Sequence, residues 1–236
     1  MIFAPSKTLA DAAWAASRRF PTVIAAFTDP VVVECAVSLA RPGKHITGVM
    51  TASAELTGKR LQLLTELVPG LRRVAVPIDP DMLASGAEEM TLMDKAAQTL
   101  GIRLLRGVLK TEAPDVEAAL RSAVSMKAQA IPTAPMTSNY FKLDHMATEA
   151  KRLRLPFVHD IPQLTNDGLA VYGPDFQDIF RSAGHYTAPI VKAEKPAGMA
   201  IEEPRSFKFI LNMATARALG ITIPQSVRLR ADQVIE

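Results

Sequence analysis

Short runs rich in β-branched residues alternate with helix-like segments along the whole chain, and this alternation constrains the fold more than any other feature. Thr22–Phe27 and Arg73–Ile78 have the length and composition of strands, whereas residues 55–68 carry leucines at helical spacing. Such alternation predicts parallel strands joined by crossover helices, which is the α/β class. The chain has 236 residues and is 48% hydrophobic, enough to build one large domain or two small ones.

The pattern predicts the elements of this α/β chain in order. Strands are expected at residues 2–4, 22–27, 46–50, 73–78, 102–108, 129–133, 155–158, 169–172 and 207–211. Helices are expected at residues 6–19, 30–41, 55–68, 85–100, 114–127, 139–152, 175–192 and 215–219. Residues 194–204 are expected to form a polar link, and the tail after Gly220 is expected to be extended.

Charge and cysteine content narrow the classes of function. The formal net charge is only +3 and the basic residues are scattered, so we expect no nucleic-acid partner. Cys35 is the only cysteine, which rules out an intramolecular disulfide, and it lies in an apolar run that favours a buried, inert thiol. No apolar stretch is long enough to span a bilayer, and the first residues lack the features of a secretory signal. From these residues alone we expect a cytoplasmic chain.

Motifs for cofactor, metal and catalytic chemistry are missing from the sequence. None of the twelve glycines forms a G-x-G pair, and no phosphate-binding loop precedes Gly58. The four histidines lie far apart, without the spacing of a metal site. We therefore expect no cofactor, no metal and no catalytic residue, although a Ser-His-Asp triad assembled from distant positions stays open.

Polar residues follow several of the expected strands, at the edge where open parallel sheets bind ligands. Taken singly, each is more often a helix cap or a turn residue than a ligand contact, most clearly where an Asp precedes Pro30. These candidate ligand-binding residues are Ser6, Thr28, Asp29, Asp79, Thr133, Asn139, His159 and Asp160.

Several stretches resemble a known family in order and spacing over nearly the whole chain. They include TDPV at 28–31, SLARPG at 38–43 leading to ITGV at 46–49, LTGKRLQLL at 56–64, NMATARALGITIP at 212–224 and RADQVIE at 230–236. These segments are similar to the ABC-transporter substrate-binding proteins that include the bacterial tryptophan and aromatic amino-acid binding proteins.

The resemblance implies a fold and a transport role. It implies two Rossmann-like lobes with parallel sheets joined by hinge strands, the type I periplasmic binding protein fold, with residues 1–51 and 169–236 in the first lobe and 52–168 in the second. A small molecule would be trapped in the cleft between the lobes by hinge closure and passed to an ABC transporter permease. By resemblance the location is periplasmic or membrane-anchored and extracytoplasmic.

The resemblance also leads us to expect a truncated first lobe. Relatives begin with an export signal or lipoprotein anchor and a strand-helix-strand unit, which are not seen before Ile2–Ala4. We expect this incomplete lobe to expose a sheet edge that offers a surface for dimerisation.

The ligand hypothesis concerns an amino acid or a related small molecule. Helix N-termini at Ser6 and Thr28 would take its carboxylate, and Asp160 or Asp79 its ammonium group. Two alternatives stay open: a ligand-sensing effector domain of similar bilobed fold, and a hydrolase or isomerase on the same kind of sheet. The resemblance favours a transport protein that is not an enzyme.

Overall fold

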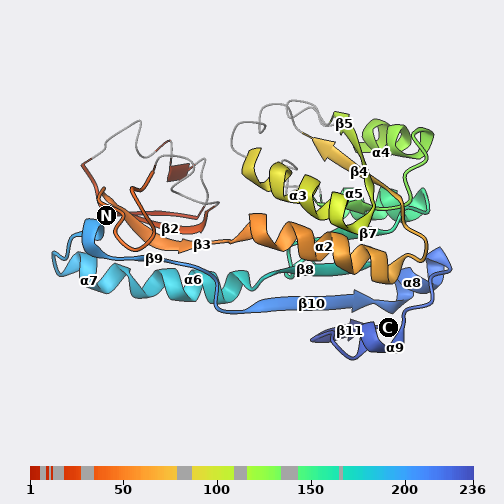
Figure 1. Cartoon of the computed structure of the whole chain (residues 1–236). Helices are drawn as coiled ribbons and strands as arrows, with labels where there is room; N and C mark the ends of the chain where they lie inside the picture. The colour runs from red at the N-terminus through yellow and green to blue at the C-terminus, as the bar shows by residue number, and fades with distance from the viewer. Residues whose placement is uncertain are drawn as a thin grey trace. The chain divides into compact units, whose positions relative to one another are not determined.

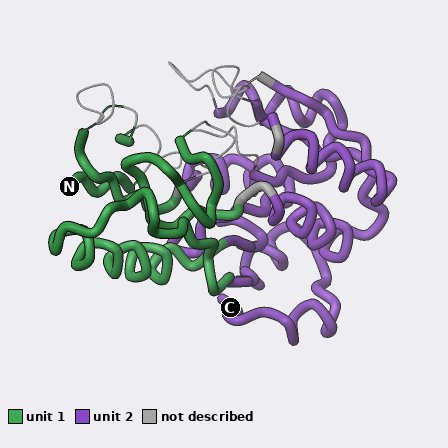
Figure 2. The backbone as a smooth tube through the Cα atoms, turned by 60° about the vertical axis from the view of Figure 1, so that its left-hand side comes forward, with its two compact units in different colours: residues 1–52, 174–207 green, residues 53–173, 208–236 purple. Residues whose placement is uncertain are grey.

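The chain divides into two compact units, each formed from two separate segments (Figure 2). The computed structural model describes residues 1–5, 9–10, 12, 19–27, 35–78, 87–108, 116–133, 143–164 and 167–236. Unit 1 comprises residues 1–52 and 174–207, and unit 2 comprises residues 53–173 and 208–236.

Unit 1 is built on a parallel sheet of four strands in the order β1-β2-β3-β9 (Figure 1). The strands are β1 (Ile2–Ala4), β2 (Thr22–Phe27), β3 (Ile46–Met50) and β9 (Ile201–Glu202). Helices α6 (Phe176–His185) and α7 (Thr187–Val191) are followed by a short 3-10 turn, η3 (Pro196–Gly198).

Alternation along the strands of unit 1 gives the sheet two buried faces. Val23 and Val49 pack against Ile179 of α6, whereas Ile24 and Ile46 belong to a second cluster that also contains Cys35. Because successive side chains of a strand point to opposite faces, one short apolar strand supplies both clusters.

Unit 2 holds a larger sheet. Its strands are β4 (Arg73–Ile78), β5 (Arg103–Val108), β6 (Ile131–Pro132), β7 (Phe157–His159), β8 (Ala170–Pro174, which ends one residue into unit 1), β10 (Phe207–Asn212, which starts one residue before unit 2) and β11 (Gln233–Ile235). Five of them lie in the order β11-β10-β8-β7-β6, and β4 pairs with β5. A parallel bridge between Val74 and Ala130 joins the two groups.

Helices of unit 2 cover both faces of this sheet. One face packs against α2 (Ser53–Leu67), α3 (Ala87–Leu100), α8 (Met213–Leu219) and α9 (Gln225–Arg228), and the other against α4 (Val116–Ser125) and α5 (Leu143–Arg152) (Figure 1). Val158 faces the first group and its neighbour Phe157 the second. This doubly covered sheet confirms the predicted α/β class.

Local predictions were wrong in three places. Residues 35–41 are not helical, because Val37 N–H donates to the oxygen of Pro42 and Ser38 Oγ accepts from Arg41 N–H, which closes a turn. The expected polar link contains β9, which pairs with Gly48 and Val49 of β3. The expected extended tail contains α9 as well as β11.

The division into units also differs from the predicted one. Residues 208–236 were expected to belong with residues 1–51, and this is wrong because they build β10 and β11 into the sheet of unit 2. Asp232 fixes this pairing from both directions: its N–H donates to Phe209 O at 2.8 Å, and its Oδ2 accepts from Phe209 N–H at 2.8 Å.

Candidate functional site

Of the predicted site residues, the structure describes Thr133, His159 and Asp160, and all three belong to unit 2. The remaining candidates lie outside the described residues, and their roles stay predictions. These are Ser6, Thr28, Asp29, Asp79 and Asn139. The cleft that the resemblance predicts likewise stays a prediction.

Thr133 and Asp160 are held together at the carboxyl ends of two neighbouring strands. Thr133 follows β6 and Asp160 follows β7, and the Thr133 N–H donates to Val158 O at 2.8 Å. The Thr133 hydroxyl donates to Asp160 Oδ1 at 3.1 Å, and both residues are buried. The hydrogen bond orients a carboxylate at the sheet edge where parallel sheets bind ligands.

His159 takes part in the turn that follows β7. Its side chain is fully buried and stacks on the ring of Phe157, with centroids 5.7 Å apart. The geometry makes Nδ1 the acceptor of the Ile161 N–H at 3.3 Å, which assigns the ring proton to Nε2 in the neutral form. This contact helps direct the chain immediately after Asp160.

The backbone of Asp160 depends on a glycine in the adjacent strand. Strand β8 pairs with β7 through His159 and Val171, and Gly173 lies further along β8. A Cβ atom built on Gly173 would stand 1.8 Å from the backbone oxygen of Asp160. Only glycine leaves room for this approach, so the position of Asp160 is fixed by β8 as well as by Thr133.

Unit 2 also holds a buried charged cluster that the sequence analysis missed. Arg60 of α2 and Glu89 of α3 have side chains that are 1% and 2% exposed, and Arg60 Nη2 lies 3.2 Å from Glu89 Oε1. Thr57 Oγ1 donates to the same Glu89 oxygen at 2.5 Å and accepts from Arg60 Nη2 at 2.9 Å. We call Thr57, Arg60 and Glu89 the buried triad.

A sequence signal for the buried triad existed. Arg60 stands four residues after Leu56 and four before Leu64, on the apolar face of its helix, and Glu89 stands four before Met93. A charged residue at such a position is rarely fully buried without a partner of opposite charge. Two buried-face charges of opposite sign on consecutive helices therefore predict an ion pair.

Burial raises the pKa of Glu89 from 4.5 to about 7. Loss of hydration is the largest cause, and the negative charge of Asp160 raises the pKa further, whereas the Arg60 charge and the Thr57 hydrogen bond lower it. Glu89 Oε2 is buried without a hydrogen-bond partner among the described residues, which also disfavours the ionised form. Glu89 therefore holds a proton more tightly than an exposed glutamate does.

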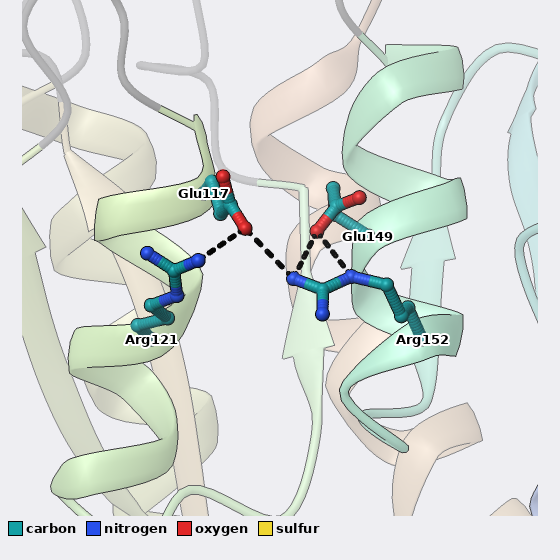
Figure 3. Close-up of polar contacts among 4 residues, drawn as sticks. All are labelled: Glu117, Arg121, Glu149 and Arg152. Carbon is teal, nitrogen blue, oxygen red and sulfur yellow. Dashed lines mark hydrogen bonds and ion pairs between the residues drawn. The ribbon is translucent and has the colours of Figure 1, made fainter.

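The basic stretch at residues 151–154 is engaged largely in ion pairs within unit 2. Arg152 of α5 reaches the carboxylates of Glu149 at 2.7 Å and Glu117 of α4 at 2.9 Å, and Glu117 also pairs with Arg121 (Figure 3). The hydrogen bond from Arg152 lowers the pKa of Glu149. Lys151 pairs with Asp167 at 2.8 Å. These ion pairs are largely exposed to solvent, so each contributes little to stability.

Unit 1 has a separate open cavity of about 380 Å³ beside the end of α6. In it the Tyr186 hydroxyl donates to Ala200 O at 2.9 Å, and burial together with Glu202 raises the tyrosine pKa above its ordinary value. Arg205, whose side chain is 71% exposed, pairs with Glu202 at the rim. Of the predicted site residues that the structure describes, none lines this cavity.

The sequence as a whole decides the family. The sequence model of the ABC transporter substrate binding proteins matches residues 1–235. The chain belongs to this family. Members bind small molecules, work with components of ABC transporters and act outside the cytoplasm. No helix in the described part of this family member is both long and apolar enough to cross a membrane.

Relatives and solved structures agree with this membership. A tyrosine-binding protein of Clostridioides difficile is 22% identical over 236 residues, which are 99% of this chain and 65% of the relative. The chain thus spans just under two thirds of that relative's length.

Two solved structures are similar over nearly the whole chain. A conserved domain protein of Vibrio cholerae has a TM-score of 0.87 at 24% identity, covering 98% of this chain and 77% of that one. An ABC domain of Streptococcus pneumonia in complex with L-Trp has a TM-score of 0.84 at 20% identity, covering 100% and 80%. These similarities confirm the predicted type I periplasmic binding protein fold.

Proposed function

We propose that this protein is the solute-binding component of an ABC importer, that its ligand is an amino acid or a related small molecule, and that Asp160 binds the ligand's ammonium group. The observation that carries the proposal is the buried Thr133–Asp160 hydrogen bond at the ends of β6 and β7. In this proposal the protein passes its ligand to a membrane permease and catalyses no reaction.

The chemistry of Asp160 supports an ammonium partner. A buried carboxylate is costly unless donors or a cation compensate for the lost hydration, and Thr133 supplies one neutral donor. A protonated amine offers three donors and a charge of opposite sign. Of the two aspartates predicted for this role, Asp160 is the one within the described residues, and its orientation is fixed from two sides.

The names of similar proteins support an amino acid as the ligand class. One relative is described as a tyrosine-binding protein, and one solved neighbour holds L-Trp. The ligand's carboxylate would then need a separate partner, for which we retain Ser6 and Thr28. The other candidates, Asp29, Asp79, Asn139 and His159, stay proposed neighbours of the ligand.

The proposed dimer has one supporting observation in unit 1. Strand β1 is an edge of the four-stranded sheet, and Phe3 on it is 42% exposed. An exposed edge strand with an aromatic side chain is a surface on which a second chain can pair. Sedimentation of the purified chain over a range of concentrations tests this part of the proposal independently of ligand binding.

A binding panel tests the proposed ligand class. The purified chain is melted with each proteinogenic L-amino acid and with matched carboxylic acids that lack the amine, because a ligand of the folded state raises the melting temperature. We expect a rise with at least one amino acid and none with its deaminated analogue. Equal rises with both compounds would contradict ammonium recognition.

Calorimetry of variants then tests Asp160. We expect D160N to weaken binding of the same amino acid by about 30-fold or more, as for loss of a buried charge partner. T133V should weaken it less, since the carboxylate remains. D94N is the matched control because Asp94 is a half-exposed carboxylate of unit 2, and it should bind as the wild type does. Full affinity in D160N would refute the assigned role.

A further inference from the structure

Basic residues that are scattered along the sequence meet at one edge of the sheet of unit 2. Arg73 begins β4 and Arg103 begins β5, and the two are partners in the parallel register. Lys127 lies in the turn before β6, where its oxygen accepts the Arg73 Nε–H at 2.7 Å, and Arg154 lies in the turn before β7. The amino ends of neighbouring parallel strands share one edge of a sheet. We call this group the basic edge, and its members are Arg72, Arg73, Arg103, Lys127 and Arg154.

The basic edge is wider than a single small anion. Strands β5 and β4 pair directly, Gln129 N–H donates to Arg73 O at 2.8 Å, and β6 pairs with β7. Neighbouring strands lie about 4.8 Å apart, so the first and the last of these four strands are about 15 Å apart. The Gln129 side chain accepts the backbone N–H groups of Arg72 and Arg73 at 2.8 and 3.0 Å, which fixes the turn that carries them. A fixed row of cations suits a surface of repeated anions.

Acidic side chains of the described residues do not neutralise the basic edge. None of its five members forms an ion pair with a carboxylate that the structure describes, and all but the half-buried Arg73 are exposed. Glu66, in the last turn of α2, pairs with Arg230, and Asp167, ahead of β8, pairs with Lys151. The gaps in the described part of unit 2 begin beyond the carboxyl ends of β4, β5 and β6, on the opposite edge, and at the uncharged residue 165.

Two members of the basic edge occupy backbone conformations that favour glycine. Lys127 follows α4 with a φ of 59°, and Arg154 follows α5 with a φ of 58°. Gly101 and Gly220 hold the same place after α3 and α8, with φ of 67° and 71°. Lys127, Gly101 and Gly220 even make the same pair of closing hydrogen bonds. A side chain in this region is strained, so folding alone favours glycine at both positions, and a use for the two charges explains the lysine and the arginine.

The chemistry of the basic edge favours a phospholipid surface. Guanidinium and ammonium groups bind phosphate oxygens, and Val124, whose oxygen accepts the Lys127 N–H at 2.8 Å, presents an aliphatic side chain that is 43% exposed. The turns that carry the basic edge contain no aromatic residue on which nucleic-acid bases could stack. Family members act outside the cytoplasm together with components of membrane transporters, so a bilayer surface is within their reach.

We propose that the basic edge binds the anionic phospholipid headgroups of a bilayer and holds unit 2 at the membrane surface. The contact is peripheral and electrostatic, and it uses the edge of the sheet opposite to the Thr133–Asp160 pair. The proposal does not depend on the identity of the solute or on the assigned role of Asp160.

Cosedimentation with vesicles tests the proposed contact. The full chain is mixed with vesicles of phosphatidylcholine alone or of phosphatidylcholine with about 30% phosphatidylglycerol, in about 20 mM and about 300 mM salt. We expect binding to the anionic vesicles at low salt to be at least about tenfold stronger than to neutral ones, and high salt to abolish it. An absence of binding to anionic vesicles at low salt would overturn the proposal.

A double variant separates binding from folding. K127G/R154G removes two charges and relieves two strained positions, so we expect an unchanged or higher melting temperature and about 25-fold weaker vesicle binding. K127N/R154N gives the same comparison, because Asn also tolerates this backbone conformation. The matched control is R106Q/R121Q, which removes two exposed cations of unit 2 that are paired with Asp94 and Glu117 and leaves the same net charge.

The control and two competitors decide the remaining outcomes. Full binding by R106Q/R121Q supports the basic edge, whereas equal weakening by both double variants would show that only net charge matters and would overturn the proposal. Displacement from the vesicles by millimolar glycerol phosphate would show a site for one phosphate instead of a surface. Binding to a DNA duplex as tight as to the anionic vesicles would assign the basic edge to polyanions in general, which also contradicts the proposal.

Discussion

Gly173 and Asp160 approach so closely that a Cβ atom at Gly173 would stand 1.8 Å from the Asp160 backbone oxygen. We expect G173A to lower the free energy of unfolding by about 1–3 kcal/mol, as overpacking does, and to weaken amino-acid binding because Asp160 must move. Chemical denaturation and calorimetry measure the two effects. G184A is the control, since nothing lies within 4 Å of a Cβ there. A stable G173A with unchanged affinity would contradict the fixed position of Asp160.

The raised pKa of Glu89 makes stability depend on pH. The folded chain holds this proton more tightly than the unfolded chain, whose glutamate titrates near 4.5. The stability that this bound proton contributes to the folded chain is fully present below pH 4.5 and is lost as the pH rises through about 7. The stability of E89Q relative to the wild type should therefore increase by about 3 kcal/mol between pH 4.5 and pH 8. Urea denaturation at several pH values measures this, and a constant difference would show that Glu89 titrates normally.

Removal of Arg60 should lower the free energy of unfolding, because it breaks the buried triad. At pH 8 we expect R60M to lose about 3–5 kcal/mol of unfolding free energy, because Glu89 must then either stay ionised without its charge partner or take up a proton. At pH 5.5 the loss should be smaller, since Glu89 is then mostly protonated. R106M, which removes an exposed pair with Asp94, should cost no more than about 1 kcal/mol at either pH. Equal losses for R60M at both pH values would contradict this account.

The C-terminal strand should contribute to the stability of unit 2. Deletion of residues 230–236 removes β11 and the paired contacts of Asp232 with Phe209. We expect a melting temperature lower by at least about 4 °C, equivalent to 1–2 kcal/mol for a chain of this size. E236Q weakens only the exposed pairs with Arg217 and Arg228 and should melt nearly as the wild type does. An unchanged melting temperature of the shortened chain would show that β11 does not contribute to the stability of unit 2.

The sequence predicted most strands because their apolar runs are short and bounded by turn residues. It missed β9 because two residues, Ile201 and Glu202, carry no pattern of their own and become a strand only by pairing with β3. It assigned residues 208–236 to the wrong unit because pairing between distant segments leaves no local signal, and β10 joins β8 only in the folded sheet.

Part of the candidate site could also be predicted from the positions of residues relative to the expected strands. Thr133 and Asp160 directly follow expected strands, and polar residues in that position were predicted to bind the ligand. The structure adds the hydrogen bond between them. Glu89 follows no strand, and its importance depends on Arg60 of another helix and on burial. A search for charged residues on apolar helix faces would have found Arg60 and Glu89, but not the hydrogen bonds that join them to Thr57.

The split composition of unit 2 has a consequence for synthesis on the ribosome. Its first segment ends at Gly173, and its last strand, β11, ends at Ile235, one residue before the end of the chain. All of unit 1 is translated before the segment that starts at Lys208. Unit 1 can thus fold while the nascent chain is still growing, whereas the sheet of unit 2 can be completed only after residues 208–236 have left the ribosome.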